Sequence, residues 1–411
     1  MEDLNGPQIC VSMRGELDRQ QRSTEAWIMD RLVEGCNCSE LAALNVDTIS
    51  LHCLPFPFLH HILVQFIYLF MFAALITCAV AGNFAVIWIV LRHERMRTVT
   101  NYYLLNLALA DILISILNTG FSGTYNLYYF WVFGPAYCAI NNLMGITPIC
   151  ASVFTMIVMS FDRYMAIVHP LSDRPSKRAT VTIIFTIWLV AFLCGVPAFL
   201  ASKLEMNYFF DGENVIEVPL CLGDNFPDGN GIDSRIFAWY NNSLVVIQYV
   251  IPLIILSFTY GKVVLVLRRN DIIGDTRNQE SVKTKRKAAN MLALVVIMFV
   301  IVWLPYNLYF LILHKYLSDM LGMKKALYLF VNIYWLGMSS SVINPVIYYF
   351  MNERFRLGFR YAFRWIPCVT VSRRDYELTF YKHTRASQAA SRLSLTVYIP
   401  QSQHGQPAKQ V

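Results

Sequence analysis

The sequence predicts an all-α membrane protein, a seven-transmembrane helix bundle with a short amphipathic eighth helix on the inner leaflet. Three observations predict this fold class: an excess of apolar residues, seven long apolar stretches, and basic residues concentrated in alternate loops. Of the 411 residues, 56% are hydrophobic and 15% are charged, whereas soluble domains average about 45–50% apolar and about 25% charged. The excess apolar surface is therefore expected to face lipid.

Seven stretches are long and apolar enough to cross a bilayer, which requires about 20 mainly apolar residues in a helix. They are 62–91, 101–128, 138–168, 179–201, 238–267, 288–313 and 326–350. We therefore assign 1–60 to an extracellular N-terminus and 61–350 to a seven-transmembrane domain. The N-terminal segment lacks the basic start, apolar core and cleavage site of a signal peptide, so the first span is expected to direct insertion.

Lys and Arg near the span ends predict the orientation, because cytoplasmic loops are enriched in them. Such residues follow the first, third, fifth and seventh spans, among them Arg92, Arg95, Arg97, Lys177, Arg178, Arg268, Arg269, Arg354 and Arg356. Segment 202–235 on the other side carries seven acids against Lys203 and Arg235. The N-terminus is therefore expected outside the cell and the C-terminus in the cytoplasm, with the bundle in the plasma membrane. The basic residues adjoin apolar spans, and no nucleic-acid-binding pattern occurs, so nucleic acid is not an expected partner.

The C-terminal part begins with a basic amphipathic segment. Phe355, Phe359 and Phe363 repeat every four residues with arginines between them, a pattern typical of a helix on the inner leaflet. We assign 351–368 to this eighth helix and its end, where Cys368 is either a palmitoyl anchor or a free cytosolic thiol. Residues 369–411 are polar and rich in Ser and Thr, which predicts a disordered cytoplasmic tail.

Asp111 lies in the middle of the second span, where a carboxylate is costly and indicates a functional site. A neutral, hydrogen-bonded structural acid is the alternative interpretation. Asn83, Ser152 and Asn344 are polar residues at similar depth in other spans. Because oxygen ligands suit a hard cation, Asp111, Ser152 and Asn344 are candidate ligands of an allosteric sodium ion.

Three short motifs stand at positions where a helix could switch. Asp162-Arg163-Tyr164 ends the third span, and an adjacent acid and arginine at the interface can form a breakable latch. The sixth span contains Trp303-Leu304-Pro305 and the seventh Asn344-Pro345-Val346-Ile347-Tyr348. A proline frees a backbone carbonyl and weakens the helix, so each site can act as a hinge; core packing at a kink is the simpler interpretation of Trp303.

Cys138 opens the third span and Cys221 lies in the acidic segment, so both face the oxidising side. A disulfide between them is expected. Of two glycosylation sequons, Asn37-Cys38-Ser39 lies in the outer N-terminus and is the expected acceptor, while Asn241-Asn242-Ser243 lies inside the fifth span and is interpreted as a false match. We find no phosphate loop, zinc motif or nucleophile elbow in the sequence, and we do not expect an enzyme.

In this order, these residues resemble the rhodopsin-like (class A) G-protein-coupled receptors over residues 60–366. The matching positions are Gly82-Asn83, Asp111, Cys138, Asp162-Arg163-Tyr164, Trp188, Pro252, Tyr260, Trp303-x-Pro305 and Asn344-Pro345-x-x-Tyr348. The resemblance adds Tyr260 to the switch residues. Opsins carry a lysine where this chain has Met338, and amine receptors carry an acid where it has Gly145. A transporter would more often show internal repeats or paired broken helices and stays a remote alternative.

Segments 95–103, 162–171, 285–287 and 337–364 are similar to tachykinin (neurokinin) receptors. That resemblance places Asn118, Asn142, Tyr240 and Phe310 in a peptide pocket. At four other pocket positions a glutamine, two histidines and a tyrosine of the family are replaced by Ala198, Asn241, Asn307 and Phe330. These departures, with Asp111 where vertebrate receptors tend to carry Glu, indicate an invertebrate member.

The resemblance implies a neuropeptide receptor for tachykinin-like amidated peptides that signals through a heterotrimeric G protein. Gq and calcium are the implied output, and Gs and cyclic AMP are a further possibility. Arrestin and receptor kinases are implied partners of the tail, where phosphorylation of Ser387, Ser391 and Ser394 would add charge. A receptor for a neuropeptide-Y-like or RYamide-like peptide is the alternative.

Overall fold

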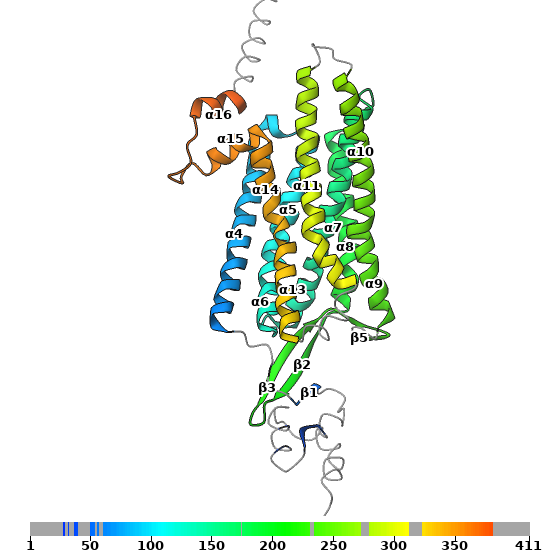
Figure 1. Cartoon of the computed structure of the whole chain (residues 1–411), viewed down its shortest axis with the longest axis vertical. Coiled ribbons are helices and arrows are strands. Elements are labelled where there is room, and N and C mark those ends of the chain that lie inside the picture. The colour runs from blue at the N-terminus through cyan, green and yellow to red at the C-terminus, as the bar shows by residue number, and fades with distance from the viewer. Residues whose placement is uncertain are drawn as a thin grey trace, which may run out of the picture.

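The structure is a computed structural model that describes residues 28, 32, 37–39, 50–53, 56, 61–173, 175–230, 234–272, 279–311 and 323–380. Within these residues, seven helices are long and apolar enough to cross a membrane, which confirms the predicted bundle. They run alongside one another down the long axis of the molecule (Figure 1). Each observed span begins and ends close to its predicted boundaries; the first runs from Ile62 to Arg92 and the seventh from Lys325 to Met351.

Several spans consist of more than one helical element. The spans are built by α4 (Ile62–Arg92); α5 (Val99–Ile114), η3 (Ser115–Thr119) and α6 (Gly120–Tyr128); α7 (Gly134–Val168); α8 (Lys177–Leu200); α9 (Arg235–Val245), η5 (Val246–Val250) and α10 (Ile251–Ile272); α11 (Gln279–Leu311); and α13 (Met323–Met338) with α14 (Ser340–Met351). The short element η2 (Glu94–Met96) joins the first two. Both η3 and η5 are π-helical turns, which are frequent at functional sites.

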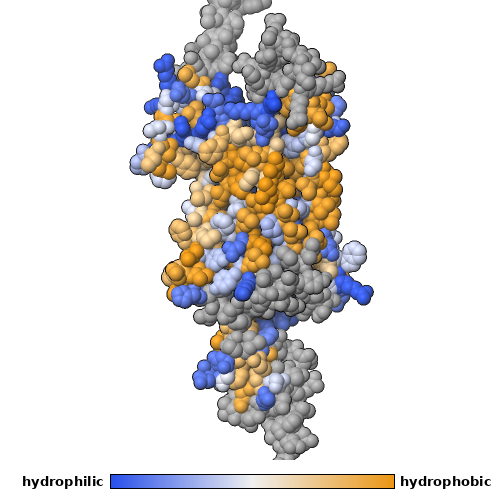
Figure 2. All heavy atoms as spheres, viewed as in Figure 1, coloured by the Kyte–Doolittle hydropathy of each residue, from blue (hydrophilic) through white to orange (hydrophobic). Residues whose placement is uncertain are grey.

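The surface of the bundle matches a lipid environment. On the face that Figure 2 shows, apolar residues cover the middle of the bundle and hydrophilic residues lie toward both ends. Large apolar side chains such as Phe70, Phe185 and Ile254 are exposed. Exposed side chains of this kind on helices of this length are expected where the solvent is hydrocarbon rather than water.

The first and seventh spans meet closely at a proline. Pro345 has no N–H to donate to the carbonyl of Ser341 one turn earlier, and Asn83 donates its Nδ2 to that carbonyl instead, at 2.8 Å. Gly82 allows the approach, because a Cβ at that position would lie 3.0 Å from Pro345 Cβ. The Gly82-Asn83 pair therefore accommodates the kink and satisfies the carbonyl that it frees.

A small sheet projects from one end of the bundle, which we call the sheet end (Figure 1). The strands β2 (Lys203–Phe210) and β3 (Val215–Leu222) form an antiparallel hairpin. A strand from the N-terminal segment, β1 (Ser50–His52), pairs with β2 in parallel, and the disulfide Cys38–Cys53 lies next to it. The short strands β4 (Asn225–Phe226) and β5 (Gly229–Asn230) pair before α9 begins. Neither the sheet nor this disulfide was predicted from the sequence.

The opposite end of the bundle, which we call the α15 end, carries two short helices. Helix α15 (Glu353–Ala362) covers part of the predicted eighth-helix segment. Its Phe355 and Phe359 are 0% and 6% exposed and pack into the main core, so much of the apolar face is covered by the bundle. Helix α16 (Arg373–Phe380) lies inside the segment predicted as a disordered tail; the structure differs from the prediction there because α16 packs on α15 and the α15 end of α4.

Candidate ligand cavity and latch

A cavity of about 270 Å³ lies between the spans at the sheet end. Six of the seven residues expected to bind a ligand line it: Asn118, Asn142, Tyr240, Asn241, Phe310 and Phe330. They come from α9, α11, α13, α7 and the π-turn of the second span, and the cavity wall also includes Gly145 and Ala198. The structure therefore brings most of the predicted residues together around one space.

Asn307 is the exception, because it does not line this cavity. Its Nδ2 donates to the carbonyl of Trp303 on the preceding turn of α11, at 2.8 Å. The Asn307 amide group is therefore used within its own helix, outside the residues that line the cavity.

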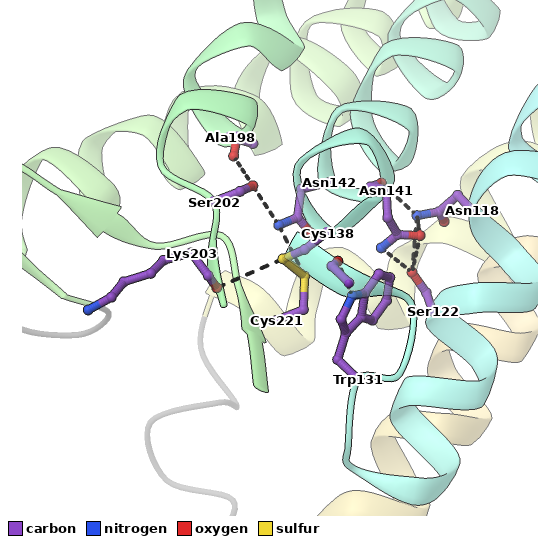
Figure 3. Close-up of a disulfide and its surroundings, with 11 residues drawn as sticks. Asn118, Ser122, Trp131, Cys138, Asn141, Asn142, Ala198, Ser202, Lys203 and Cys221 are labelled. Atoms are coloured by element: carbon purple, nitrogen blue, oxygen red, sulfur yellow. Dashed lines mark hydrogen bonds between the residues drawn. A yellow bond between two sulfur atoms is a disulfide. The ribbon is translucent and has the colours of Figure 1, made fainter. Parts of the chain in front are cut away.

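A network of amides and hydroxyls lies at the wall of the cavity around Asn118. The Asn118 Nδ2 donates to Ser122 Oγ at 3.0 Å and to Asn141 Oδ1 at 3.1 Å, and Tyr334 donates its hydroxyl to Asn118 Oδ1 at 3.0 Å. Figure 3 shows the Asn118, Ser122 and Asn141 side chains pointing toward one another. Asn118 links the second, third and seventh spans and is held in one orientation. Ser122, Asn141 and Tyr334 were not predicted, although their polar side chains inside apolar spans were a signal that could have identified them.

A disulfide joins Cys138 at the start of α7 to Cys221 on β3, with a Cα–Cα distance of 5.6 Å, which confirms the predicted bond. Beside it, Asn142 donates to Ser202 Oγ at 2.8 Å, and Ser202 donates to the Ala198 carbonyl at 2.6 Å (Figure 3). The hairpin is thereby tied to the third and fourth spans at the rim of the cavity.

Tyr240 crosses from the fifth span to the fourth. Its hydroxyl donates to the carbonyl of Cys194 at 2.8 Å, and its ring lies 5.9 Å from that of Phe226. Tyr240 thus contributes one ring face to the cavity while its hydroxyl is used within the protein.

A second, smaller cavity of about 30 Å³ lies deeper in the bundle and is lined by Asp111, Ser152, Ser341, Asn344 and Trp303. Asn344 donates to Asp111 Oδ2 at 2.9 Å. The predicted sodium ligands thus lie around one space that is large enough for a small ion or a water molecule. One carboxylate and two serine hydroxyls are donors that fit sodium, whereas Asn344 turns its amide nitrogen toward Asp111.

The residues predicted to act as hinges lie within the bundle, and Trp303 and Asn344 line the smaller cavity. Trp303 is buried and contacts Tyr306 and Phe299, with ring centroids 5.4 and 6.0 Å away. Pro305 and Pro345 lie inside α11 and α14. Tyr348 is 0% exposed, and its ring lies 5.6 Å from that of Phe355 on α15. Tyr260 is half-buried and packs against the same core.

The predicted latch is closed. Arg163 on α7 donates to the Asp162 carboxylate through Nη2 and, at 3.1 Å, through Nε. The Arg163 guanidinium also donates to Thr100 Oγ1, and the Thr100 hydroxyl donates to Asp162 Oδ2 at 3.2 Å. Tyr164, the third residue of the motif, lies beside His169. Arg163 is thus held by the second and third spans, and Thr100 is a third member that the sequence did not reveal.

Two predicted modification sites fall on described residues. Asn37 is exposed, and its Oδ1 accepts hydrogen bonds from Ser39 N and Ser39 Oγ at 3.3 and 3.2 Å. Cys368 is exposed and follows Trp365, which is 76% exposed. The predicted phosphorylation sites Ser387, Ser391 and Ser394 lie outside the described residues.

The chain is a bundle of seven membrane spans with a cavity at the sheet end and the cluster of Asp162, Arg163 and Thr100 toward the other end. Residues 82–348 match the family described as 7 transmembrane receptor (rhodopsin family). The chain belongs to this family.

Similar receptors cover most of the chain. The neuromedin-K receptor of Cavia porcellus is 40% identical over 306 residues, which are 74% of this chain and 66% of that receptor. The substance-P receptor of Homo sapiens is 37% identical over 335 residues, 79% of each chain. The tachykinin-like peptides receptor 86C of Drosophila melanogaster is 39% identical over 297 residues, 72% of this chain and 58% of that receptor. Family membership and these relatives also make a transporter untenable.

Proposed function

We propose that this chain is a neuropeptide receptor for tachykinin-like amidated peptides, with the sheet end outside the cell and the α15 end in the cytoplasm. The observation that carries the proposal is the cavity at the sheet end, where six residues expected from the tachykinin-receptor resemblance meet. The names of the similar receptors support the same ligand class. In this orientation the N-terminus (1–60) and the hairpin are extracellular, and the segment after 350 is cytoplasmic.

The chemistry of the cavity suits an amidated peptide end. The Asn118 network presents amide and hydroxyl groups that can exchange hydrogen bonds with a terminal carboxamide, while Phe310 and Phe330 contribute aromatic surface. A cavity that combines apolar walls with a few fixed polar groups is typical of a ligand site. Ala198 and Asn241 line the same cavity and differ from the family. This difference keeps a neuropeptide-Y-like or RYamide-like ligand as the second candidate.

Signalling in this proposal is a shift between two arrangements of the bundle. Peptide contacts favour an arrangement in which the cytoplasmic end of α11 moves outward, and the ligand shifts the equilibrium only by its differential affinity for the two states. Arg163 then leaves Asp162 and Thr100 and helps to receive a heterotrimeric G protein. Gq with calcium is the primary output and Gs with cyclic AMP the second. Receptor kinases and arrestin act on the tail in the same scheme.

Sodium would be held by Asp111 with Ser152 and Ser341. Its positive charge would stabilise the arrangement of the bundle seen in the structure, in which these side chains surround the smaller cavity. Asp111→Asn is then expected to change sodium sensitivity or coupling while surface expression is kept. Wild-type sodium dependence and coupling in this variant would refute the role. N-glycosylation at Asn37, and a palmitoyl anchor at Cys368 that inserts in the inner leaflet beside Trp365, complete the proposed membrane topology.

The test is a panel of amidated peptides, including substance P and neuromedin K, applied to cells that express the receptor. Calcium and cyclic AMP are both recorded. Asn118→Ala is expected to weaken the response of an active peptide at least tenfold, because two or more hydrogen bonds in the cavity are lost. Thr77→Ala is the matched control, because Thr77 is exposed and its hydroxyl bonds only its own helix in the described structure. No response to any peptide, or equal potency in both variants, would contradict the proposal.

A further inference from the structure

The segment after Cys221 runs along the rim of the cavity toward α9. Gly223 lines the cavity, and a Cβ there would lie 2.9 Å from the Asn142 side chain. The next residues are fixed on both sides, because Asn225 N donates to the Ala201 carbonyl at 3.1 Å and the Phe226 ring packs near Tyr240. Asp224 is thereby held at the rim, between the cavity and the sheet.

Asp224 differs from the other aspartates described in the same segment. Asp211 accepts hydrogen bonds from the backbone of Glu213 and Asn214 at 2.9 and 2.7 Å. Asp228 accepts from Ser234 Oγ at 2.5 Å and from Ile236 N at 3.0 Å. These bonds lower the pKa of both carboxyls. Both carboxylates are therefore stabilised in their charged form by hydrogen bonds within the protein.

The Asp224 carboxyl, by contrast, has a backbone interaction only with its own residue. Its Oδ1 is fully buried and has no hydrogen-bond partner in the structure, and no described cation pairs with it. Burial and the nearby negative charge of Glu205 raise the pKa of the Asp224 carboxyl. A buried carboxylate oxygen without a partner is destabilising, and a second acid beside it adds repulsion. A positive charge at this point would relieve both effects.

The surroundings offer a place for such a charge. Tyr125 lines the cavity and interacts electrostatically with Asp224, and its ring stacks on that of Tyr129 with centroids 6.1 Å apart. Carboxylates next to aromatic rings suit a guanidinium or ammonium group, which gains from both the charge and the ring faces. The rim thus joins an acidic group to the cavity that the peptide is proposed to enter.

We propose that Asp224, with Glu205 and Tyr125 beside it, is a binding site for a cationic side chain of the ligand at the rim of the cavity. The proposal rests on the peptide-receptor function in so far as a peptide carries the cation. The site would take arginine or lysine in the part of the peptide that stays near the sheet while the amidated end occupies the cavity. The rim site would select for a positive charge on the peptide, whereas the residues that line the cavity are uncharged.

The first experiment tests the site without any peptide. L-arginine amide is added to the purified full-length receptor, and L-citrulline amide, which replaces the guanidinium by a neutral urea, is added in parallel. A ligand that binds the folded state raises its thermal midpoint. We expect arginine amide to raise the midpoint of the wild type, with no rise for citrulline amide and no rise in Asp224→Asn. Glu213→Gln, which removes an exposed acid of the same segment, should keep the full rise.

Equal shifts with the two amides, a shift retained in Asp224→Asn, or no shift in the wild type would overturn the site. The thermal midpoint of Asp224→Asn without either amide shows whether this variant folds. If it does not fold, Asp224→Ser is used in its place.

The second experiment uses the most potent peptide of the panel and a form with citrulline for arginine, norleucine for lysine and an acetylated N-terminus. The neutral form should lose about ten- to hundredfold in affinity on the wild type, as expected for a hydrogen bond to a charged group, but little on Asp224→Asn. An equal loss on both receptors would place the cation elsewhere. A panel without an active peptide would contradict the proposed function, whereas the arginine amide result judges the rim site independently.

Discussion

Helix α16 is held against the α15 end of α4 by a few contacts, and Tyr376 makes several of them. Tyr376 stacks on Tyr361 with ring centroids 3.7 Å apart and an interplanar angle of 8°. Its hydroxyl bonds His93 Nε2 at 2.6 Å, and Phe380 stacks on the His93 ring at 4.0 Å. His93 Nδ1 lies 2.8 Å from the Ile89 carbonyl. A carbonyl can only accept, so Nδ1 carries the proton and Nε2 accepts from Tyr376.

Two substitutions at Tyr376 should have graded effects. Tyr376→Phe keeps the stacked ring and removes one buried donor, at a cost of about 1–3 kcal/mol. Tyr376→Ala also removes the ring, and loss of a buried aromatic side chain costs about 3–5 kcal/mol. Each 1.4 kcal/mol is a tenfold change in an equilibrium constant, so the docking equilibrium constant of α16 should fall about fivefold to hundredfold in the first variant and at least a hundredfold in the second. An isolated helix of this length is not stable in water, so undocking also unfolds it.

Hydrogen exchange on the purified receptor measures this directly. The amides of Arg373–Phe380 should exchange fastest in Tyr376→Ala, more slowly in Tyr376→Phe and slowest in the wild type. Arg374→Ala is the control, because Arg374 is exposed, and it should exchange like the wild type. Unchanged exchange in Tyr376→Ala would refute the docking described above, and equal exchange in the two Tyr376 variants would show that the ring stack contributes nothing.

Three further predictions follow from single contacts. Burial lowers the pKa of His93 below its ordinary 6.5, so the undocked state binds more protons than the docked state. Docking of α16 should therefore weaken as the pH falls below about 6.5. The measurement is faster hydrogen exchange of the α16 amides at low pH, after correction for the change in intrinsic exchange rate. Gly82→Ala should lower the thermal midpoint, because overpacking against Pro345 costs about 1–3 kcal/mol of folding free energy. Gly261→Ala, with nothing within 4 Å of the new Cβ, should not lower it, and equal midpoints in the two variants would contradict the close packing at Gly82. Thr100→Val should raise ligand-free signalling up to about fivefold, because the contact between Arg163 and Asp162 loses about 1 kcal/mol of hydrogen bonding. An unchanged basal calcium signal would argue against a role for Thr100.

The spans could be predicted because their cause is local. A helix that crosses a bilayer must be apolar over about 20 residues, so each span can be predicted from a short window of sequence. The disulfide Cys138–Cys221 could also be predicted, because the predicted topology already placed both cysteines on the same side of the membrane. The six predicted residues that line the cavity came from a resemblance rather than from physical reasoning.

The features that the sequence did not reveal depend on partners far away in the chain. The β2–β3 hairpin is paired with β1, which lies more than a hundred residues earlier, and is tied to α7 by Cys221. Helix α16 contains charged residues on most of its surface, and its docking depends on His93, which is 283 positions from Tyr376. Nothing in residues 369–380 alone indicates that this segment would contact His93. The same holds for Thr100, whose role in the latch appears only when the second and third spans are side by side.

The two cavities are joined by one pair of aromatic rings, and this arrangement suggests how a ligand could act on the latch. Tyr306 lines the larger cavity and Trp303 the smaller one, and the two rings meet edge to face at 5.4 Å. Trp303 Nε1 is buried without a hydrogen-bond partner in the structure, and its ring packs on the open face of Gly337. The indole is therefore held by packing alone and can change position without breaking a hydrogen bond. A ligand that displaces Tyr306 would remove one ring contact of Trp303, and the indole could then repack against Gly337 or within the smaller cavity that it lines with Asn344.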